Sequence, residues 1–246
     1  MISIPLSLVS DTPMSAVEHL AREESLLEAC DAGELGGMLR FWEPQEQAVV
    51  VGYANSVLTE TRLQDCDRDG VRVLRRCSGG GTVLQMPGVL NYTLVIPLPE
   101  DGPLSTVGGT NTWMMTRLKD ALAKIDGLSD RLSIRGITDL CLGEKKFVGS
   151  AQRRKRSALL FHGSILLEAP LELMERYLAF PTHQPDYRES RSHLEFCCNL
   201  EKPAAAVKAA LLKAWDVSSK EITPPRERME RLLRERYYQA TWHRKW

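Results

Sequence analysis

Three consecutive glycines, Gly79, Gly80 and Gly81, follow the basic pair Arg75-Arg76 and precede a strand-like stretch at 90–98. Glycine loses more backbone entropy on folding than any other residue, so three in a row are costly. Consecutive backbone N–H groups without side chains can wrap a phosphate or a carboxylate. A loose turn between two strands is the alternative interpretation. The glycine run alone therefore predicts a loop that holds an anionic small molecule.

The two common nucleotide motifs do not fit this loop. A phosphate-binding P-loop needs a lysine after its last glycine, whereas Thr82 and Val83 follow Gly81. A dinucleotide-binding fingerprint opens a helix, whereas this chain re-enters a strand. The type of ligand must therefore be inferred from other residues.

A second group of candidate residues lies at 145–151. Lys145 and Lys146 are adjacent, so strand alternation sends them to opposite faces, and one can enter a cleft while the other is solvated. Gly149, Ser150 and Ala151 are small enough to permit a close approach beside that lysine. A lysine held near a phosphoryl or carbonyl oxygen is a common electrostatic catalyst. The alternative is a basic hairpin edge, where lysine discourages strand pairing.

Composition excludes several classes of function. The 246 residues are 43% hydrophobic and 26% charged, which is typical of a globular core. Lys+Arg and Asp+Glu both number 32, so no basic field indicates nucleic acid. No run approaches the roughly 18 apolar residues of a membrane helix, and the N-terminal stretch lacks the basic region of a signal peptide. We expect a cytoplasmic protein with no membrane partner, whose six cysteines are free, buried thiols.

The elements that must position these residues are helices and short strands in irregular order. A first helix begins either at Thr12-Pro13 or at the possible capping box of Ser15 and Glu18. Strands are expected at 39–42, 48–52, 71–76, 90–98, 139–154 (two strands joined by a turn at 143–144) and 157–168, and helices at about 110–125, 170–179, 203–215 and 224–239. Because the strands meander rather than alternate with helices, we expect one α+β domain with a largely antiparallel or mixed sheet and flanking helices.

Three segments together resemble the lipoate–protein ligase and octanoyltransferase family. They are RFWEPQEQAVVVGYAN (40–55), RRCSGGGTVLQMPGVLNYTL (75–94) and TDLCLGEKKFVGSAQRRKRSALLFHGSILLE (138–168). The resemblance covers nearly the whole chain. It implies a fold shared with biotin ligases and transfer of a lipoyl or octanoyl group to a lysine of a carrier domain. In the ligases ATP first forms an acyl-adenylate, whereas in the transferases a cysteine takes the acyl group from a carrier protein.

The resemblance also implies roles for individual residues. Lys146 matches the family lysine that contacts the activated carbonyl and phosphate oxygens, where a cation stabilises developing negative charge. Asp139 matches an acidic position near the nucleotide and holds Mg²⁺, a ribose or an amine. Because they alternate faces, at most one of the two arginines should reach the ligand directly. The full expected binding set is Arg75, Arg76, Ser78, Gly79, Gly80, Gly81, Thr82, Gln85, Asn91, Asp139, Gly149, Ser150, Ala151 and His162. For His162 an equally weighted alternative is a buried histidine whose hydrogen bonds are satisfied within its strand.

This chain departs from the family in two ways. Gln85 stands where many members have histidine, and glutamine keeps hydrogen bonding but cannot carry a proton. A positioning role survives there, whereas a proton-transfer role does not. The second departure is length: we expect a single catalytic domain over 1–246, with a helical part at about 200–246 and no full accessory domain. Activation would then need a separate subunit, or the enzyme would be a transferase.

Cys141 separates the two reactions. It shares a strand face with Asp139, which is permissive for a nucleophile, but a neighbouring carboxylate raises a thiol pKa. The family transferases carry their cysteine in a loop further upstream, and this chain has no cysteine between 78 and 140. We therefore expect an ATP- and Mg²⁺-dependent lipoate–protein ligase acting on a lipoyl domain or a glycine-cleavage H-type protein. An octanoyltransferase using Cys141, and a non-catalytic lipoyl or acyl-adenylate binder suggested by Gln85, are the alternatives.

Overall fold

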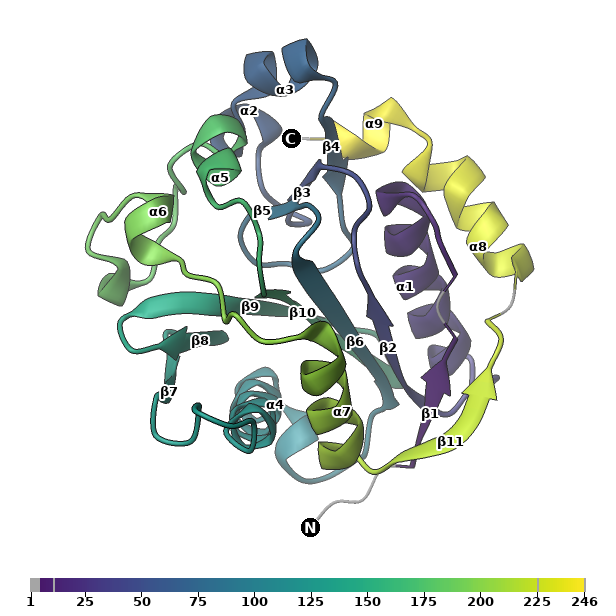
Figure 1. Cartoon of the computed structure of the whole chain (residues 1–246). Helices are drawn as coiled ribbons and strands as arrows, with labels where there is room; N and C mark the ends of the chain where they lie inside the picture. The colour runs from purple at the N-terminus through teal and green to yellow at the C-terminus, as the bar shows by residue number, and fades with distance from the viewer. Residues whose placement is uncertain (1–4, 11, 225, 246) are drawn as a thin grey trace.

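The computed structural model describes residues 5–10, 12–224 and 226–245. Within these residues, eight strands form a mixed sheet (Figure 1). In spatial order they are β11 (Val217–Ile222), β1 (Leu6–Val9), β2 (Gly37–Trp42), β6 (Val89–Pro97), β10 (Ala158–Leu166), β9 (Lys145–Arg154), β8 (Asp139–Leu142) and β7 (Leu132–Arg135). Strand β1 is parallel to both neighbours, and every pairing from β2 to β7 is antiparallel. The expected α+β class with a mixed, largely antiparallel sheet is confirmed.

A smaller sheet carries the glycine run. Over the described residues it has three strands in the order β4 (Arg72–Arg75), β3 (Ala48–Val51) and β5 (Val83–Gln85). Strand β3 lies in the middle, parallel to β4 and antiparallel to β5. The chain from β4 to β5 must therefore cross the carboxyl end of β3. That crossing, at 76–82, contains the three glycines.

Helices cover both faces of the large sheet. Helix α1 (Ala16–Asp31) packs on β6 and β10, while α4 (Val107–Leu122) and α7 (Ala204–Ala214) pack on each other at the opposite face (Figure 1). The further helical segments are α2 (Val57–Glu60), α3 (Leu63–Asp69), α5 (Glu172–Tyr177), α6 (His193–Phe196), α8 (Arg226–Leu232), α9 (Ala240–His243), the 3-10 turns η1 (Pro103–Ser105) and η2 (Asp186–Arg188), and the π-turn η3 (Leu233–Tyr237). Among the described residues, no helix has both the length and the apolar character needed to span a membrane.

The capping box of Ser15 and Glu18 sets the start of α1. Each side chain hydrogen-bonds the backbone N–H of the other residue, which satisfies two donors that the helix leaves unpaired. The alternative start at Thr12-Pro13 is wrong, because residues 12–15 are not helical. Strand alternation in β2 and β6 sends Met38 and Val95 toward α1, and Leu39 and Leu94 toward α4 and α7.

The expectation of a helical part at about 200–246 is only partly correct. Helices α7, α8 and α9 are present, but Val217–Ile222 forms the edge strand β11 beside β1. Strands β1, β5, β7 and β11 were not among the expected strands. All four are short, at three to six residues, so their sequences carry little of the alternation that reveals a strand.

Candidate active site

The hairpin of β8 and β9 positions Lys146 and Asp139. Lys146 Nζ lies 2.7 Å from Asp139 Oδ1, and the two side chains are 28% and 13% exposed. The backbone register shifts between Leu140 and Cys141, so Asp139 faces Gly149 while Cys141 faces Lys146. A Cβ at Gly149 would lie 2.9 Å from both Cε and Nζ of Lys146. Glycine at 149 therefore leaves the space that the lysine head occupies.

The Lys146 side chain is a cation at neutral pH. Burial alone would lower the pKa of Lys146, but the charge of Asp139 and its hydrogen bond raise the pKa above its ordinary value. Lys145 lies on the outer face, where its exposed side chain donates to the carbonyl of Leu194 at 3.3 Å. Strand alternation thus separates the two lysines as expected.

Tyr187, in η2, completes the surroundings of Asp139. Its hydroxyl donates to Asp139 Oδ2 at 2.7 Å and accepts from Cys141 Sγ at 3.7 Å. Burial and the adjacent carboxylate raise the pKa of Tyr187, so it stays protonated. Sequence reasoning missed Tyr187, because the segment around it has no helical or strand period that would place it beside Asp139.

The cysteines around Lys146 are buried thiols. Cys141 is fully buried, and burial raises its pKa, with a further increase from Asp139 that the Tyr187 hydrogen bond opposes. Cys197 pairs with Lys146 through a β-bridge, and burial raises its pKa as well. An activated cysteine nucleophile needs a lowered pKa and access to the cleft, and Cys141 and Cys197 have neither.

The glycine loop turns its carbonyls inward. The Arg76 guanidinium beneath it donates to Gly79 O at 2.6 Å and to Gly81 O at 2.7 Å, and also to Val50 O at 3.2 Å. In a planar trans peptide the N–H points opposite to the C=O. The N–H groups of Gly80 and Thr82 therefore point away from Arg76, on a loop whose three glycines are exposed. An outward set of N–H groups of this kind is suited to an anion.

The glycine loop lies against β9. Gly80 has φ of +84°, which favours glycine, and a Cβ there would lie 3.3 Å from the Ala151 Cβ. Ala151 and Gly149 share one strand face, so the loop and the Lys146 head lie on the same side of β9. Ser150 points to the other face, where its hydroxyl lies 2.7 Å from that of Tyr92. The two sequence motifs thus meet, with Ser150 on the opposite side.

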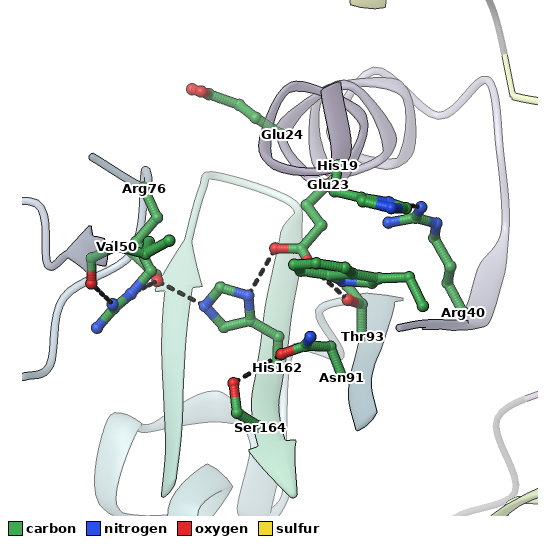
Figure 2. Close-up of polar contacts among 12 residues, drawn as sticks. His19, Glu23, Glu24, Arg40, Val50, Arg76, Asn91, Thr93, His162 and Ser164 are labelled. Atoms are coloured by element: carbon green, nitrogen blue, oxygen red, sulfur yellow. Dashed lines mark hydrogen bonds and ion pairs between the residues drawn. The ribbon is translucent and has the colours of Figure 1, made fainter. Parts of the chain in front are cut away.

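His162 connects the glycine loop to α1 (Figure 2). Its Nε2 lies 2.6 Å from Ser78 Oγ, and its Nδ1 lies 2.7 Å from Glu23 Oε2. His162 is thus a buried histidine whose two ring nitrogens both have hydrogen-bond partners, which is one of the two interpretations drawn from the sequence. It is also directly hydrogen-bonded to the loop. Glu23 was missed, although the sequence holds a signal: it lies between Leu20 and Leu27 on the apolar face of α1, where a carboxylate needs a partner.

Gln85 and Asn91 form a reciprocal amide pair. Gln85 Nε2 donates to Asn91 Oδ1 at 3.0 Å, and Asn91 Nδ2 donates to Gln85 Oε1 at 2.8 Å. The Ser164 hydroxyl joins them, accepting from Gln85 at 3.0 Å and donating to Asn91 at 2.6 Å. The network uses only groups that do not titrate near neutral pH, which fits a positioning role for Gln85. Thr82, beyond the loop, directs its hydroxyl to Glu60 at 3.3 Å.

Both arginines of the loop motif point into the protein. Arg75 is fully buried and donates to the carbonyls of two segments, Gly52, Tyr53 and Asn55 on one side and Trp242 and His243 on the other. The sequence placed Arg75 and Arg76 among the ligand-binding residues. In the structure both arginines instead shape the loop. Arg76 hydrogen-bonds the loop carbonyls from the protein side, and Arg75, at the base of the loop, hydrogen-bonds the C-terminal segment.

Asp139 is the carboxylate expected to hold Mg²⁺. Its two oxygens already contact Lys146 and Tyr187. Across the part of the chain that the structure describes, no group of three or more His, Cys, Asp or Glu side chains is arranged to bind a metal ion. Asp139 is one carboxylate, and a Mg²⁺ site of the usual kind would take its other ligands from water and substrate phosphates.

Comparison with known proteins identifies a family and two named relatives. Residues 15–215 match the lipoyl protein ligase A/B catalytic domain family. Octanoyltransferase LipM of Oceanobacillus iheyensis is 27% identical over 202 residues, which cover 77% of this chain and 74% of the relative. Lipoate-protein ligase A subunit 1 of Thermoplasma acidophilum is 26% identical over 196 residues, which cover 78% of this chain and 74% of the relative.

Solved structures share the fold. A chain from the bipartite lipoate protein ligase and E2 lipoyl domain of Thermoplasma acidophilum superposes with a TM-score of 0.81 at 20% identity, covering 99% of this chain and 97% of that one. A lipoate-protein ligase A bound with ATP gives a TM-score of 0.73 at 20% identity, covering 98% and 99%. With the family match spanning 201 residues that include the glycine loop, Asp139 and Lys146, this chain belongs to the lipoyl protein ligase A/B catalytic domain family.

Proposed function

We propose that the protein is a lipoate–protein ligase, which activates lipoate or octanoate with ATP and transfers the acyl group to a lysine of a lipoyl carrier domain. The observation that carries the proposal is the Lys146–Asp139 ion pair beside an exposed glycine loop, with a buried thiol at Cys141. Relatives named as ligases and a structural neighbour bound to ATP support it.

The site offers a group for each half of the reaction. In the first half the lipoate carboxylate attacks the α-phosphorus of ATP, forming the acyl-adenylate and releasing pyrophosphate. The outward N–H groups of Gly80 and Thr82 donate hydrogen bonds to phosphate oxygens. In the second half the acceptor amine attacks the acyl carbonyl and AMP leaves. Lys146 stabilises the negative charge that develops on the oxygens, an effect of about 3 kcal/mol for one well-placed donor.

Asp139 would hold Mg²⁺ in the nucleotide-bound enzyme, and the bound ion would supply neutralisation of phosphate charge. Arg76, Ser78 and His162 hold the loop, and Gly149 and Ala151 admit the ligand beside Lys146. A lipoyl domain, or an H-type carrier protein, would be the acceptor. The bipartite ligase of Thermoplasma acidophilum supports a separate accessory subunit as a further partner.

An octanoyltransferase is the second candidate, favoured by the relative named octanoyltransferase LipM. That route needs a cysteine that forms a thioester. Cys141 is fully buried and its pKa is raised. The partly exposed Cys198, next in sequence to Cys197, has a pKa raised by burial to about 11. Neither thiol has the thiolate character that thioester formation requires at neutral pH.

One experiment separates the two routes. The purified protein is incubated with a lipoyl domain and either lipoate with Mg-ATP or octanoyl carrier protein without ATP, and the domain is weighed by mass spectrometry. We expect modification only with ATP, release of pyrophosphate, and most of the activity retained in Cys141→Ser. ATP-independent transfer, with a thioester trapped on Cys141, would establish the transferase instead.

A further inference from the structure

A continuous chain of hydrogen bonds runs from α1 to the glycine loop (Figure 2). Glu23 Oε2 and His162 Nδ1 are 2.7 Å apart, and His162 Nε2 and Ser78 Oγ are 2.6 Å apart. Arg76 Nε donates to Ser78 Oγ at 3.0 Å. We call these four residues the relay. Its far end, the Arg76 guanidinium, holds the carbonyls of Gly79 and Gly81.

The hydrogen bonds of the relay are all donated in one direction, from Arg76 through Ser78 and His162 to Glu23. Glu23 Oε1 accepts from Trp42 Nε1 at 3.0 Å and from Thr93 Oγ1 at 2.6 Å, which leaves Oε2 for the N–H of His162 Nδ1. Because Arg76 donates to Ser78 Oγ, the serine hydroxyl hydrogen is free to be donated to His162 Nε2. Burial would raise the pKa of Glu23, but His162, Thr93 and Arg40 lower it to about 2, so Glu23 is a carboxylate at neutral pH.

The order Ser78–His162–Glu23 is that of a serine-hydrolase triad, but Ser78 is not placed as a nucleophile. Its side chain has no exposed surface, and its oxygen already accepts a hydrogen bond from Arg76. A nucleophile must present a lone pair to the substrate. The relay therefore ends in the loop backbone, where the Gly79 and Gly81 carbonyls fix the direction of the N–H groups of Gly80 and Thr82.

We propose that Glu23 is a positioning residue, which fixes the tautomer of His162 and through Ser78 and Arg76 sets the orientation of the glycine-loop N–H groups toward the ligand. The proposal rests on the proposed function for the identity of that ligand, an acyl-adenylate. It concerns a helix that contributes no residue to the expected binding set. It also explains why a carboxylate is buried in α1 at 3% exposure.

Glu23→Gln tests the proposal. Trp42 and Thr93 both donate to the same oxygen, so they hold the amide oxygen of the glutamine and turn its NH₂ toward His162. His162 Nδ1 must then accept, and the proton moves to Nε2, against Ser78. By ¹⁵N NMR of the ring nitrogens in the ligand-free protein, assigned among the five histidines with His162→Asn, we expect the Nδ1–H form in the parent protein and the Nε2–H form in the variant.

Glu24→Gln is the matched control. Glu24 is the next residue of α1 and is equally buried, at 5% exposure, but it points away from His162 and contacts Tyr237 and Arg236 instead (Figure 2). We expect the backbone order parameters of residues 78–82, measured by ¹⁵N relaxation, to be lower in Glu23→Gln than in Glu24→Gln. Affinity for a non-hydrolysable acyl-adenylate analogue should fall about 10- to 100-fold in Glu23→Gln alone, the range seen when supporting hydrogen bonds are lost at metal sites.

Ser78→Ala is the second variant, in case Glu23→Gln does not fold. It removes one hydroxyl and should reproduce the lower order parameters while His162 keeps its Nδ1–H. An unchanged tautomer and unchanged order parameters in Glu23→Gln would overturn the proposal, and so would an acyl ester found on Ser78 by mass spectrometry. If the parent protein does not bind the analogue, the proposed function fails, while the tautomer and relaxation measurements still decide the relay.

Discussion

Lys146 and Asp139 are held 2.7 Å apart across adjacent strands, and the residue that makes room for this pair is Gly149, three positions beyond the lysine. Asp139 receives a second hydrogen bond from Tyr187. The lysine head is thus fixed before any ligand binds, which is the preorganisation that electrostatic catalysis needs.

Lys146→Ala should abolish acyl transfer, with a loss of at least about a hundredfold, because the donor to the developing charge is gone. The fold should survive, since Asp139 keeps its hydrogen bond to Tyr187 and no apolar core group is removed. The rate is followed by mass spectrometry of the lipoyl domain, and folding by the melting temperature. Lys145→Ala is the control, because that side chain lies on the outer face. Equal losses in the two variants would contradict the assignment.

Gly149→Ala should reduce activity without unfolding the protein. The new Cβ would meet the Cε and Nζ atoms of Lys146 at 2.9 Å, and the flexible end of the lysine can move away. Its displacement from Asp139 should cost about a hundredfold in rate, the typical effect of misplacing a catalytic group by about 1 Å. Gly36→Ala is the control, because its Cβ would meet no atom within 4 Å. Full activity in Gly149→Ala would show that the lysine position is not critical.

Gly79→Ala and Gly81→Ala test the close approach of the ligand to the loop. A Cβ at either position meets no protein atom within 4 Å, and neither residue has a positive φ. The melting temperature should therefore stay close to that of the parent protein, while calorimetric affinity for an acyl-adenylate analogue falls. Gly80 is a poorer test, because its φ of +84° strains any side chain. Unchanged affinity in both variants would remove the close-approach argument.

Local patterns in the sequence predict much of this site. Strand alternation separates Lys146 from Lys145, and small residues at 149–151 indicate where a ligand or backbone comes close. These inferences succeed because they depend on neighbours in the chain. The interior hydrogen bonds depend on distant residues. Arg75 bonds carbonyls 167 and 168 residues away, at Trp242 and His243, and no local pattern reveals that partner.

Glu23 lies between these two cases. A carboxylate on the apolar face of α1 is visible in the sequence as a break in the pattern around Leu20 and Leu27. Its partner His162 is 139 residues away, so the sequence can indicate that a buried partner exists but not which residue it is. The sequence gives even less indication of Tyr187, because this residue lies in no segment with a helical or strand periodicity.

His19 should make stability fall at acid pH. It is 2% exposed, it stacks on Trp42 with ring centroids 4.2 Å apart, and its Nδ1 is bonded to the Arg40 guanidinium. Burial, then the charge of Arg40, lower the pKa of His19 to about 3 from an ordinary value near 6.5. Because Arg40 is always protonated, Nδ1 must accept, and a proton there would break the contact.

The direction of the pH effect on stability follows from which state of the chain, native or unfolded, binds the proton. Between about pH 6.5 and about pH 3 the unfolded chain protonates His19 and the native protein does not, so falling pH favours unfolding. The stability is fully present above the unfolded pKa and is lost as pH falls toward the folded one. From about pH 7.5 to about pH 5 this single group should remove about 2 kcal/mol. Glu23, with its pKa lowered to about 2, adds a loss of the same sign only at lower pH.

His19→Gln keeps an acceptor for Arg40 and does not titrate. Urea unfolding at about pH 7.5, about pH 6 and about pH 5 should show a free energy of unfolding that falls less steeply in this variant than in the parent protein, by about 2 kcal/mol over the range. The measured quantity is the difference in slope between the variant and the parent protein. A difference in their stabilities at the highest pH therefore does not affect the test. His183→Gln is the control, since His183 is exposed and should leave the slope unchanged. Parallel slopes in all three proteins would mean that His19 takes up its proton in the native state as readily as in the unfolded chain.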